Sequence, residues 1–473
     1  MSERLVVVGN GMAGSRTVLD VLTRDPDRFE VTVLGDEQRP AYNRVLLSGL
    51  LAGAETEADL ALPASDWVRV LPGTRATRVD RHRRLVHTGL GGPVPYDRLV
   101  LATGSRPHLP PALVPREGLR GVFCFRTLED ARRILRYARE VRRAVVVGGG
   151  LLGLETARAL QGRGLAVTVL HAAGHLLDRQ LDPDAGRVLA DSVARLGITV
   201  VLGARPAGLA GADRVTGVLL ADGRTVEADL VVVATGVRPD TALAAGAGLA
   251  VDRGILVDDQ LRTTDPRVHA VGDCAQHRGQ VPGLVDPAWA HARVVADQLT
   301  GGDPAAAYPG SVTVAKLKAA GLAVAAMGLP APERDGDELV VVAEPRRGVH
   351  RSAVIRDGRL VGATLVGDVR RSAALLHALD RGTPLPAERA ALLVDLGGGG
   401  AAPEVPVADL PDTEPVCTCT GVTKAAVVAA VRGGLTDLAA VVDATRAGRG
   451  CGSCRPLLER VVEWAAAQPA GAR

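Results

Sequence analysis

The sequence predicts an α/β protein, because one strand–turn–helix unit occurs in it twice. In the first copy, the apolar residues 4–8 lead into a turn with Gly9, Gly11 and Gly14, and then into a helical stretch. In the second, residues 144–147 lead into Gly148-x-Gly150-x-x-Gly153, an offset of 139 residues (148 minus 9). In such turns the first Gly allows a tight bend, the second lets the backbone approach a pyrophosphate, and the third lets helix and strand pack closely. We therefore expect two Rossmann-like dinucleotide-binding domains.

A second pair of segments repeats in the same order. Residues 102–107 read ATGSRP and residues 234–239 read ATGVRP, each after an apolar strand. Recurrence of both motifs in one order is improbable by chance, and it indicates a duplication of the whole unit.

Composition excludes several classes of protein. The chain has 473 residues, of which 47% are hydrophobic and 23% charged, as in ordinary globular proteins. A net charge of +3 gives no case for nucleic-acid binding. The N-terminal apolar run is too short for a signal peptide, and no apolar run is long enough for a membrane span, so we expect a cytoplasmic protein.

Four of the six cysteines lie in the last 60 residues. They form Cys417-Thr418-Cys419 and Cys451-Gly452-Ser453-Cys454, separated by helical patterns at residues 424–432 and 435–445. Such clustering in a chain without a leader indicates metal ligation rather than disulfides. Four thiolates suit either zinc or an iron–sulfur cluster, so the residues alone leave both open.

Further motifs connect the chain to a family. These are residues 39–48 (RPAYNRVLLS), the two ATG segments and Val271-Gly272-Asp273, in addition to the first glycine turn. With them, residues 4–310 resemble flavoprotein reductases of the ferredoxin reductase and nitrite reductase large-subunit kind. The resemblance implies FAD in a discontinuous domain of residues 1–112 and 241–311, and NAD(P)H in an inserted domain of residues 113–240.

The resemblance also implies the FAD site. Asp36 or Glu37, after the second strand, would hold a ribose, Arg44 would lie near FAD, and Asp273 would bind the ribityl chain. A charged surface turn and a surface salt bridge are the alternative interpretations of the acids and of Arg44. The full expected set is Gly9, Gly11, Met12, Ala13, Gly14, Asp36, Glu37, Arg44, Ala102, Thr103, Gly104 and Asp273.

For NAD(P)H the expected set is Gly148, Gly150, Leu151, Leu152, Gly153, Glu155, His171 and Gly236. The resemblance places Glu155 near the nicotinamide–flavin stack, although it also suits a helix N-terminus electrostatically. His171 stands where NADH enzymes usually present an acid to the ribose, and a His repels a 2′-phosphate less. We therefore expect some tolerance of NADPH, while the preference between NADH and NADPH stays open.

The remaining chain divides into three parts. Residues 312–396 alternate β-like runs with a helix near residues 372–379, and they resemble the third domain of the nitrite reductase family, an α+β interface module. Residues 397–413 are a linker by composition, with four consecutive Gly. Residues 414–466 resemble the small helical domain of bacterioferritin-associated-ferredoxin type, which implies a [2Fe–2S] cluster on Cys417, Cys419, Cys451 and Cys454.

The predicted function is an NAD(P)H-dependent reductase that passes electrons through FAD and the cluster to a partner enzyme. Residues 41–51 contain no Cys, which disfavours thiol-based disulfide reduction. Length and domain order resemble the electron-transfer subunit of assimilatory nitrate reductase, which implies a separate molybdenum nitrate reductase as acceptor, or a sirohaem nitrite reductase. We do not expect nitrite reduction by this chain itself, because the sirohaem and [4Fe–4S] domain needs further cysteines. A ferredoxin or rubredoxin reductase, and a zinc-binding nucleotide sensor, are the alternatives.

Overall fold

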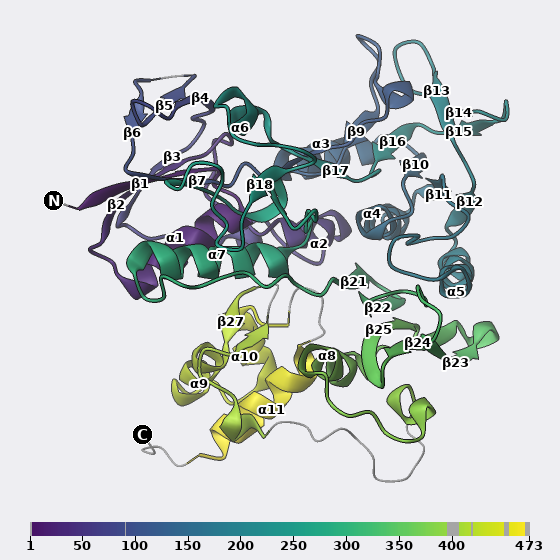
Figure 1. The fold of residues 1–473 in the computed structure, drawn as a ribbon. Helices are drawn as coiled ribbons and strands as arrows, with labels where there is room; N and C mark the ends of the chain where they lie inside the picture. Colours follow the sequence, from purple (N-terminus) through teal and green to yellow (C-terminus); the bar gives the residue numbers. More distant parts are fainter. Residues whose placement is uncertain (1, 90, 395–405, 418–419, 449–453, 469–473) are drawn as a thin grey trace.

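The computed structural model describes residues 2–89, 91–394, 406–417, 420–448 and 454–468 (Figure 1). The N-terminal sheet is fully parallel, with strand order β19-β7-β1-β2-β3. Both faces are covered, as parallel sheets require. Helices α1 and α7 cover one face, and a three-stranded antiparallel sheet with α6 covers the other. The elements are β1 (Glu3–Val8), α1 (Met12–Arg24), β2 (Phe29–Leu34), β3 (Val68–Leu71), β4 (Ala76–Asp80), β5 (Leu85–Thr88), β6 (Val94–Pro95), β7 (Arg98–Leu101), α6 (Ala242–Gly246), β19 (Val268–Ala270) and α7 (Val285–Thr300).

The second sheet repeats this arrangement. Its parallel order, β12-β11-β10-β16-β9, superimposes on the first when β10 is matched to β1. Helices again cover one face and a three-stranded antiparallel sheet covers the other. The elements are β9 (Val122–Cys124), α3 (Leu128–Ala138), β10 (Arg143–Val147), α4 (Leu151–Gly162), β11 (Ala166–His171), α5 (Pro183–Arg195), β12 (Thr199–Leu202), β13 (Pro206–Ala210), β14 (Gly217–Leu220), β15 (Thr225–Glu227) and β16 (Leu230–Val233). The predicted pair of Rossmann-like domains is confirmed.

The two ATG segments meet where the chain crosses between these domains. Strand β8 (Ser105–Pro107) pairs antiparallel with β17 (Val237–Pro239), so that one copy of the repeat hydrogen-bonds the other. The preceding threonines act reciprocally: Oγ1 of Thr103 donates to the carbonyl of Asp240 at 2.6 Å, and Oγ1 of Thr235 donates to that of His108 at 2.6 Å. The duplicated segments therefore bind each other where the chain crosses between the two domains.

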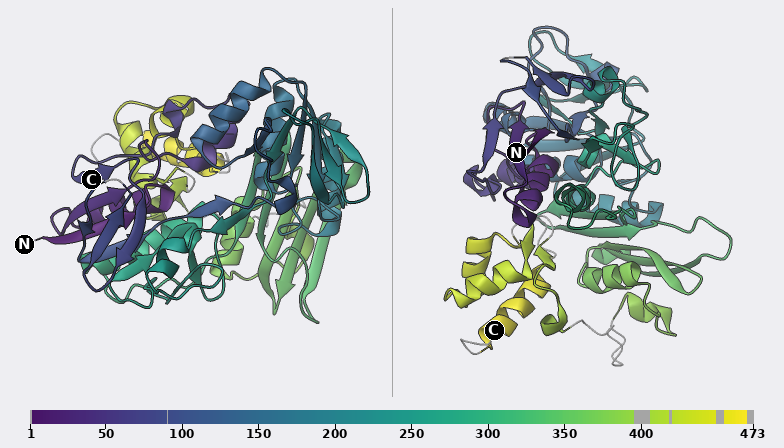
Figure 2. Two further views of the ribbon diagram at one scale, coloured as in Figure 1. Left: turned by 90° about the horizontal axis from the view of Figure 1, so that it is seen from above. Right: turned by 60° about the vertical axis from the view of Figure 1, so that its left-hand side comes forward.

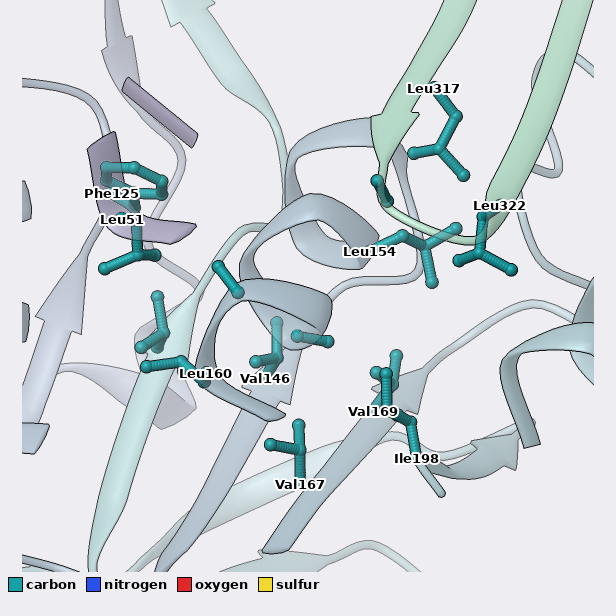
Figure 3. Close-up of a cluster of buried hydrophobic side chains, with 14 of the residues drawn as sticks. Leu51, Phe125, Val146, Leu154, Leu160, Val167, Val169, Ile198, Leu317 and Leu322 are labelled. Atoms are coloured by element: carbon teal, nitrogen blue, oxygen red, sulfur yellow. The ribbon is translucent and has the colours of Figure 1, made fainter. Parts of the chain in front are cut away.

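A third, antiparallel sheet has the order β21-β22-β25-β24-β23. It comprises β21 (Val314–Ala319), β22 (Leu322–Gly328), β23 (Glu338–Glu344), β24 (Val349–Arg356) and β25 (Arg359–Val366), followed by α8 (Ser372–Arg381). Figure 3 shows how this sheet joins the others: Leu317 and Leu322 pack on Leu154 of α4, while Leu51, from α2 (Leu47–Ala52), lies on the opposite side of that helix. Helix α4 thus packs against its own parallel sheet, against α2 of the N-terminal part and against the third sheet.

The C-terminal module is small and mainly helical. It contains β26 (Pro415–Cys417), β27 (Val422–Thr423), α9 (Lys424–Arg432), α10 (Leu438–Thr445) and α11 (Arg455–Ala466) around a core of mostly Val side chains. Val407, within the segment expected to be a linker, is buried in this core. The module lies below α1 and α7 (Figures 1 and 2). Across the described part of the chain, no helix combines the length and the apolar character that a membrane crossing needs.

Candidate functional site

The first glycine turn leaves one open face. Gly9 has φ +115°, and a Cβ there would lie 2.1 Å from the carbonyl oxygen of Ala102. A Cβ on Gly14 would lie 2.0 Å from the oxygen of Gly9, so both positions require glycine for packing. A Cβ on Gly11, by contrast, would meet no atom within 4 Å. Gly11 is also the N-cap of α1, which no described side chain caps. The turn therefore presents bare helix N–H groups to an open space, which suits a pyrophosphate.

The second turn has the same geometry. Gly148 has φ +121° and would place a Cβ 2.3 Å from the oxygen of Ala234, while Gly153 would place one 1.9 Å from the oxygen of Gly148. Gly150, the N-cap of α4, faces open space, as does Gly236. Each turn is therefore shaped by contact with its own ATG segment, and each fits a dinucleotide.

A cavity of about 570 Å³ extends from the first turn to the first turns of α4. It collects residues from segments far apart in the sequence. Of the expected FAD residues, it is lined by Gly9, Gly11, Met12, Ala13, Asp36, Glu37, Arg44, Ala102, Thr103, Gly104 and Asp273, while Gly14 packs behind the turn. Leu151, Leu152 and Glu155 of the expected NAD(P)H set line its other end. The two predicted sites thus meet in one space.

The two candidate ribose acids differ in their surroundings. Glu37 accepts a hydrogen bond of 2.8 Å from the Tyr42 hydroxyl and is ion-paired with Arg44. Burial raises the pKa of Tyr42 to about 12, so this hydroxyl stays a donor at neutral pH. Asp36 is 63% exposed and lies 3.9 Å from Arg75. Asp36 is therefore the acid better placed to accept from a ribose.

Asp273 is held from both dinucleotide-binding domains. Its Oδ2 accepts from the Ser105 hydroxyl at 2.8 Å and from Nη2 of Arg126 at 2.8 Å. Arg126 follows β9 in the second domain and also lines the cavity. Tyr42, Ser105 and Arg126 are site residues that the sequence did not predict. Tyr42 and Ser105 stood inside motifs already noted, whereas nothing in the spacing pointed to Arg126.

His171 supports the second turn from beneath. It is the last residue of β11, its side chain is 11% exposed, and its Nδ1 accepts from the amide of Gly149 at 3.1 Å. Its Nε2 lies 3.2 Å from the carboxylate of Asp178. The expected tolerance of NADPH stays a prediction, and Asp178 is an acid near the turn that the sequence did not predict.

Glu155 lies between two cavities. It is 7% exposed, it lines the cofactor cavity, and it lines a second cavity of about 630 Å³ between α2, α4 and the third sheet. The backbone amide of Lys318 in β21 donates to its Oε1 at 3.1 Å. The third sheet therefore fixes this carboxylate beside the first turns of α4.

The cysteine module brings two of its expected ligands together. Cys417, 1% exposed at the end of β26, and Cys454, the N-cap of α11, belong to the same core. The amide of Gly448 lies 3.5 Å from the Cys417 sulfur, an N–H···S contact of the kind that tunes iron–sulfur sites. Cys419 and Cys451 lie outside the described residues. Cys417 and Cys454 therefore fit a cluster bound at the N-terminal end of α11.

Three family models match the chain. The model described as pyridine nucleotide-disulphide oxidoreductase matches residues 3–292, which is more than half of the chain. The chain belongs to this family. A BFD-like [2Fe-2S] binding domain matches residues 415–464, and a rubredoxin NAD+ reductase C-terminal domain matches residues 314–383.

Two curated relatives from Bacillus subtilis (strain 168) match nearly the whole chain. One is a nitrite reductase [NAD(P)H], 36% identical over 98% of this chain and 57% of its own length. The other is an assimilatory nitrate reductase electron transfer subunit, 35% identical over 98% of this chain and 60% of its own length. The chain thus spans less than two thirds of each relative, so the expected agreement in length with the electron-transfer subunit does not hold. Among solved structures, a putidaredoxin reductase–putidaredoxin complex has a TM-score of 0.73 and 28% identity, covering 83% of this chain and 96% of that one.

These findings confirm several expectations. Family membership makes the chain an NAD(P)H oxidoreductase with FAD, and the C-terminal module a [2Fe–2S] domain.

The other cysteines agree with a role in packing. Cys274 is completely buried, its sulfur donates to the carbonyls of Leu101 and Val271 at 3.4 and 3.3 Å, and burial raises its pKa. Burial likewise raises the pKa of Cys124. Neither thiol has the lowered pKa of a reactive cysteine.

Proposed function

We propose that this chain oxidises NAD(P)H and delivers the electrons singly, through its [2Fe–2S] module, to a separate reductase of nitrate or nitrite assimilation. The observation that supports the proposal is the cavity that joins the first glycine turn to the first turns of α4, because residues expected to bind FAD and residues expected to bind NAD(P)H line it together. When bound, FAD supplies the conversion of a hydride into single electrons, and the cluster supplies a one-electron outlet.

The protein's own contribution is binding and alignment. Gly11 and Gly150 free the helix N–H groups for phosphates, and Asp36 and Asp273 accept from hydroxyl groups of FAD in this proposal. Glu155, fixed by Lys318, borders the space for the nicotinamide. Hydride transfer depends on alignment more than on acid–base groups, and the packing of α4 against α2 and the third sheet supports that alignment.

The domain limits belong to the same proposal. Residues 1–112 with 241–311 would form the FAD domain and residues 113–240 the NAD(P)H domain, supported by β17, which ends at Pro239, and α6, which begins at Ala242. Residues 312–396 would form the interface domain, 397–413 the linker and 414–466 the cluster domain. Cytoplasm is the proposed compartment, since NAD(P)H is available there.

The acceptor is proposed from the relatives. A molybdenum nitrate reductase stands first, because the whole-chain match includes an assimilatory nitrate reductase electron transfer subunit. A sirohaem nitrite reductase stands second. A ferredoxin or rubredoxin reductase is the rival function, supported by the rubredoxin NAD+ reductase C-terminal domain match at residues 314–383.

Purified protein tests the proposal in two steps. Flavin and iron–sulfur absorbance, both bleached by NADH or NADPH, are expected first, and a colourless zinc protein would refute the redox function. Nitrate reduction driven by NAD(P)H, dependent on both this chain and a nitrate reductase, is expected second. Activity with a rubredoxin and none with nitrate or nitrite reductases would favour the rival.

A further inference from the structure

Two contacts between described residues join the C-terminal module to the N-terminal domain. The first is Gly421, in the turn between β26 and β27. A Cβ added there would lie 3.0 Å from Nη1 of Arg16 in α1 and 3.1 Å from Cζ3 of Trp289 in α7. Arg16 lies 5.1 Å from the Trp289 ring centroid and bonds Asp20 through Nε at 2.9 Å, which fixes the guanidinium over the indole. The turn therefore rests on a preformed surface.

The second point is Arg446, which ends α10 with φ +62°. Its Nη1 donates to the carbonyl of Ala58 at 3.0 Å and lies 3.9 Å from the carboxylate of Asp59. Ala58 and Asp59 belong to the short helix Ala58–Leu60, which follows α2 in the sequence. Arg446 keeps 38% of its side chain exposed, so this contact is a surface latch and not part of the module's core.

The first contact lies close to the cofactor cavity. Ala288, the neighbour of Trp289 in α7, lines that cavity, as do Val285 and Asp286 at the start of the helix. On the other side, Gly421 is four residues from Cys417 (421 minus 417). Helix α7 thus lines the cofactor cavity at Ala288 and lies against Gly421 of the module at the next residue, Trp289, and Figure 1 shows β27 below α7.

We propose that Trp289 and Arg446 are positioning residues that dock the cluster module on the flavin domain, and that this docked arrangement is the one in which the module is reduced. Only the statement that the docked module is the one reduced rests on the proposed function. The statement that the module docks rests on the contacts of Gly421 and Arg446.

The variants follow from the contacts. Arg446→Glu reverses the charge opposite Asp59 and removes the donor to Ala58, whereas Arg446→Lys keeps the charge. Trp289→Phe shortens the ring that meets Gly421. It removes no side-chain hydrogen bond known among the described residues, because Nε1 of Trp289 is buried without a partner there. Arg187→Glu is the matched control, since Arg187 is 69% exposed on α5 and pairs with Asp184 instead.

The test uses the complete chain with its cofactors. Small-angle scattering measures the radius of gyration, and stopped-flow absorbance separates flavin reduction by NADH from the later bleaching of the cluster. For Arg446→Glu we expect a larger radius, unchanged flavin reduction and cluster reduction slower by about tenfold, the factor for about 1.4 kcal/mol of docking free energy. Arg446→Lys and Arg187→Glu should stay near wild type. Adding Asp59→Arg to Arg446→Glu should restore part of the cluster rate, because the swap restores the ion pair but not the hydrogen bond to Ala58.

Two results would overturn the inference. Scattering and cluster rates equal to those of wild type in both Arg446→Glu and Trp289→Phe would show that these residues do not dock the module. An expanded particle with an unchanged cluster rate would show that the docked arrangement is not the one that is reduced. If NADH reduces nothing in wild-type protein, the proposed function fails, while scattering still decides whether the module docks.

Discussion

Nη2 of Arg126 donates a hydrogen bond of 2.8 Å to Oδ2 of Asp273, across 147 residues of sequence. Arg126 follows β9, an edge strand of the second sheet, and Asp273 follows β19, an edge strand of the first sheet. The pair therefore joins the two dinucleotide-binding domains inside the cofactor cavity. The same Nη2 lies 2.7 Å from the hydroxyl of Ser105. A cation is thereby held where the proposed flavin site meets the nicotinamide site.

Replacement of this cation should shift the flavin potential. Arg126→Met removes one positive charge from beside Asp273, so the cavity becomes more negative and disfavours added electrons. We expect the two-electron potential to fall by on the order of 30 mV, equivalent to about 1.4 kcal/mol. Spectroelectrochemical titration measures this. Arg106→Met is the control, because Arg106 lines the same cavity but is 57% exposed and pairs with Asp240. Equal shifts in the two variants would contradict a specific role for Arg126.

Substitutions at Gly11 and Gly150 should affect the FAD site and the NAD(P)H site independently. Ala at Gly150 adds a Cβ that meets no protein atom, so the fold should be unaffected while the approach of the NAD(P)H phosphates is blocked. Loss of one charge-assisted hydrogen bond costs about 1.5 to 3 kcal/mol, and the Kd for NAD(P)H should rise accordingly. FAD content should stay normal. Gly11→Ala should do the reverse, with reduced FAD content.

Gly153→Ala provides the steric control for this pair. Its Cβ would collide with the carbonyl of Gly148, so this variant should lose thermal stability as well as binding. Thermal denaturation together with isothermal titration distinguishes the cases. A Gly150→Ala protein that binds NAD(P)H normally would place the pyrophosphate elsewhere.

Substitution of His171 should weaken the binding of NADH and of NADPH equally. Because its Nδ1 holds the amide of Gly149, His171→Ala should loosen the turn and weaken NADH and NADPH binding by about fivefold each, as expected for about 1 kcal/mol. His171→Asn, whose side-chain oxygen can accept the same hydrogen bond, should recover part of the affinity. A change in the NADH to NADPH ratio would show instead that the ring contacts the ribose.

Acid should destabilise the FAD-domain side of the molecule through His291. This residue of α7 is fully buried, and its Nδ1 accepts from the amide of Gly272, next to Asp273. Burial first, and then the nearby His277, lowers the pKa of His291 to about 4, from 6.5 in the unfolded chain. Between these values the unfolded chain binds a proton that the native protein does not, so the free energy of unfolding falls as pH falls from 6.5 to 4.

At pH 4 the buried His291 lowers the free energy of unfolding by about 3 kcal/mol, and above pH 6.5 this destabilisation vanishes. His269, whose pKa burial likewise lowers to about 4, should add to the slope. His291→Gln keeps an acceptor for Gly272 and cannot titrate, so urea denaturation at pH 7.5, 6 and 5 should show a shallower dependence than in wild type. An unchanged slope would mean that His291 binds protons equally in the native and unfolded states.

The parts of the site that sequence could predict are those made by local geometry. Gly9, Gly14, Gly148 and Gly153 were recognisable because turn and helix packing impose glycine within six residues. The surroundings of Glu37 were not recognisable, since its hydrogen bond to Tyr42 and ion pair with Arg44 redirect the carboxylate. For His171, the sequence predicted the position at the strand end, while the structure shows the ring beneath the turn and not beyond it.

By itself, the sequence determined that the protein has two matched nucleotide turns and one cluster of four cysteines, because these chemistries need fixed residues at short spacings. Only the tertiary structure decided which distant groups meet them. Glu155 is fixed by a strand 163 residues away and Asp273 by Arg126, and the cysteine module meets Trp289 and Ala58. Such contacts depend on how whole sheets and helices pack, and no local pattern of residue types encodes that packing.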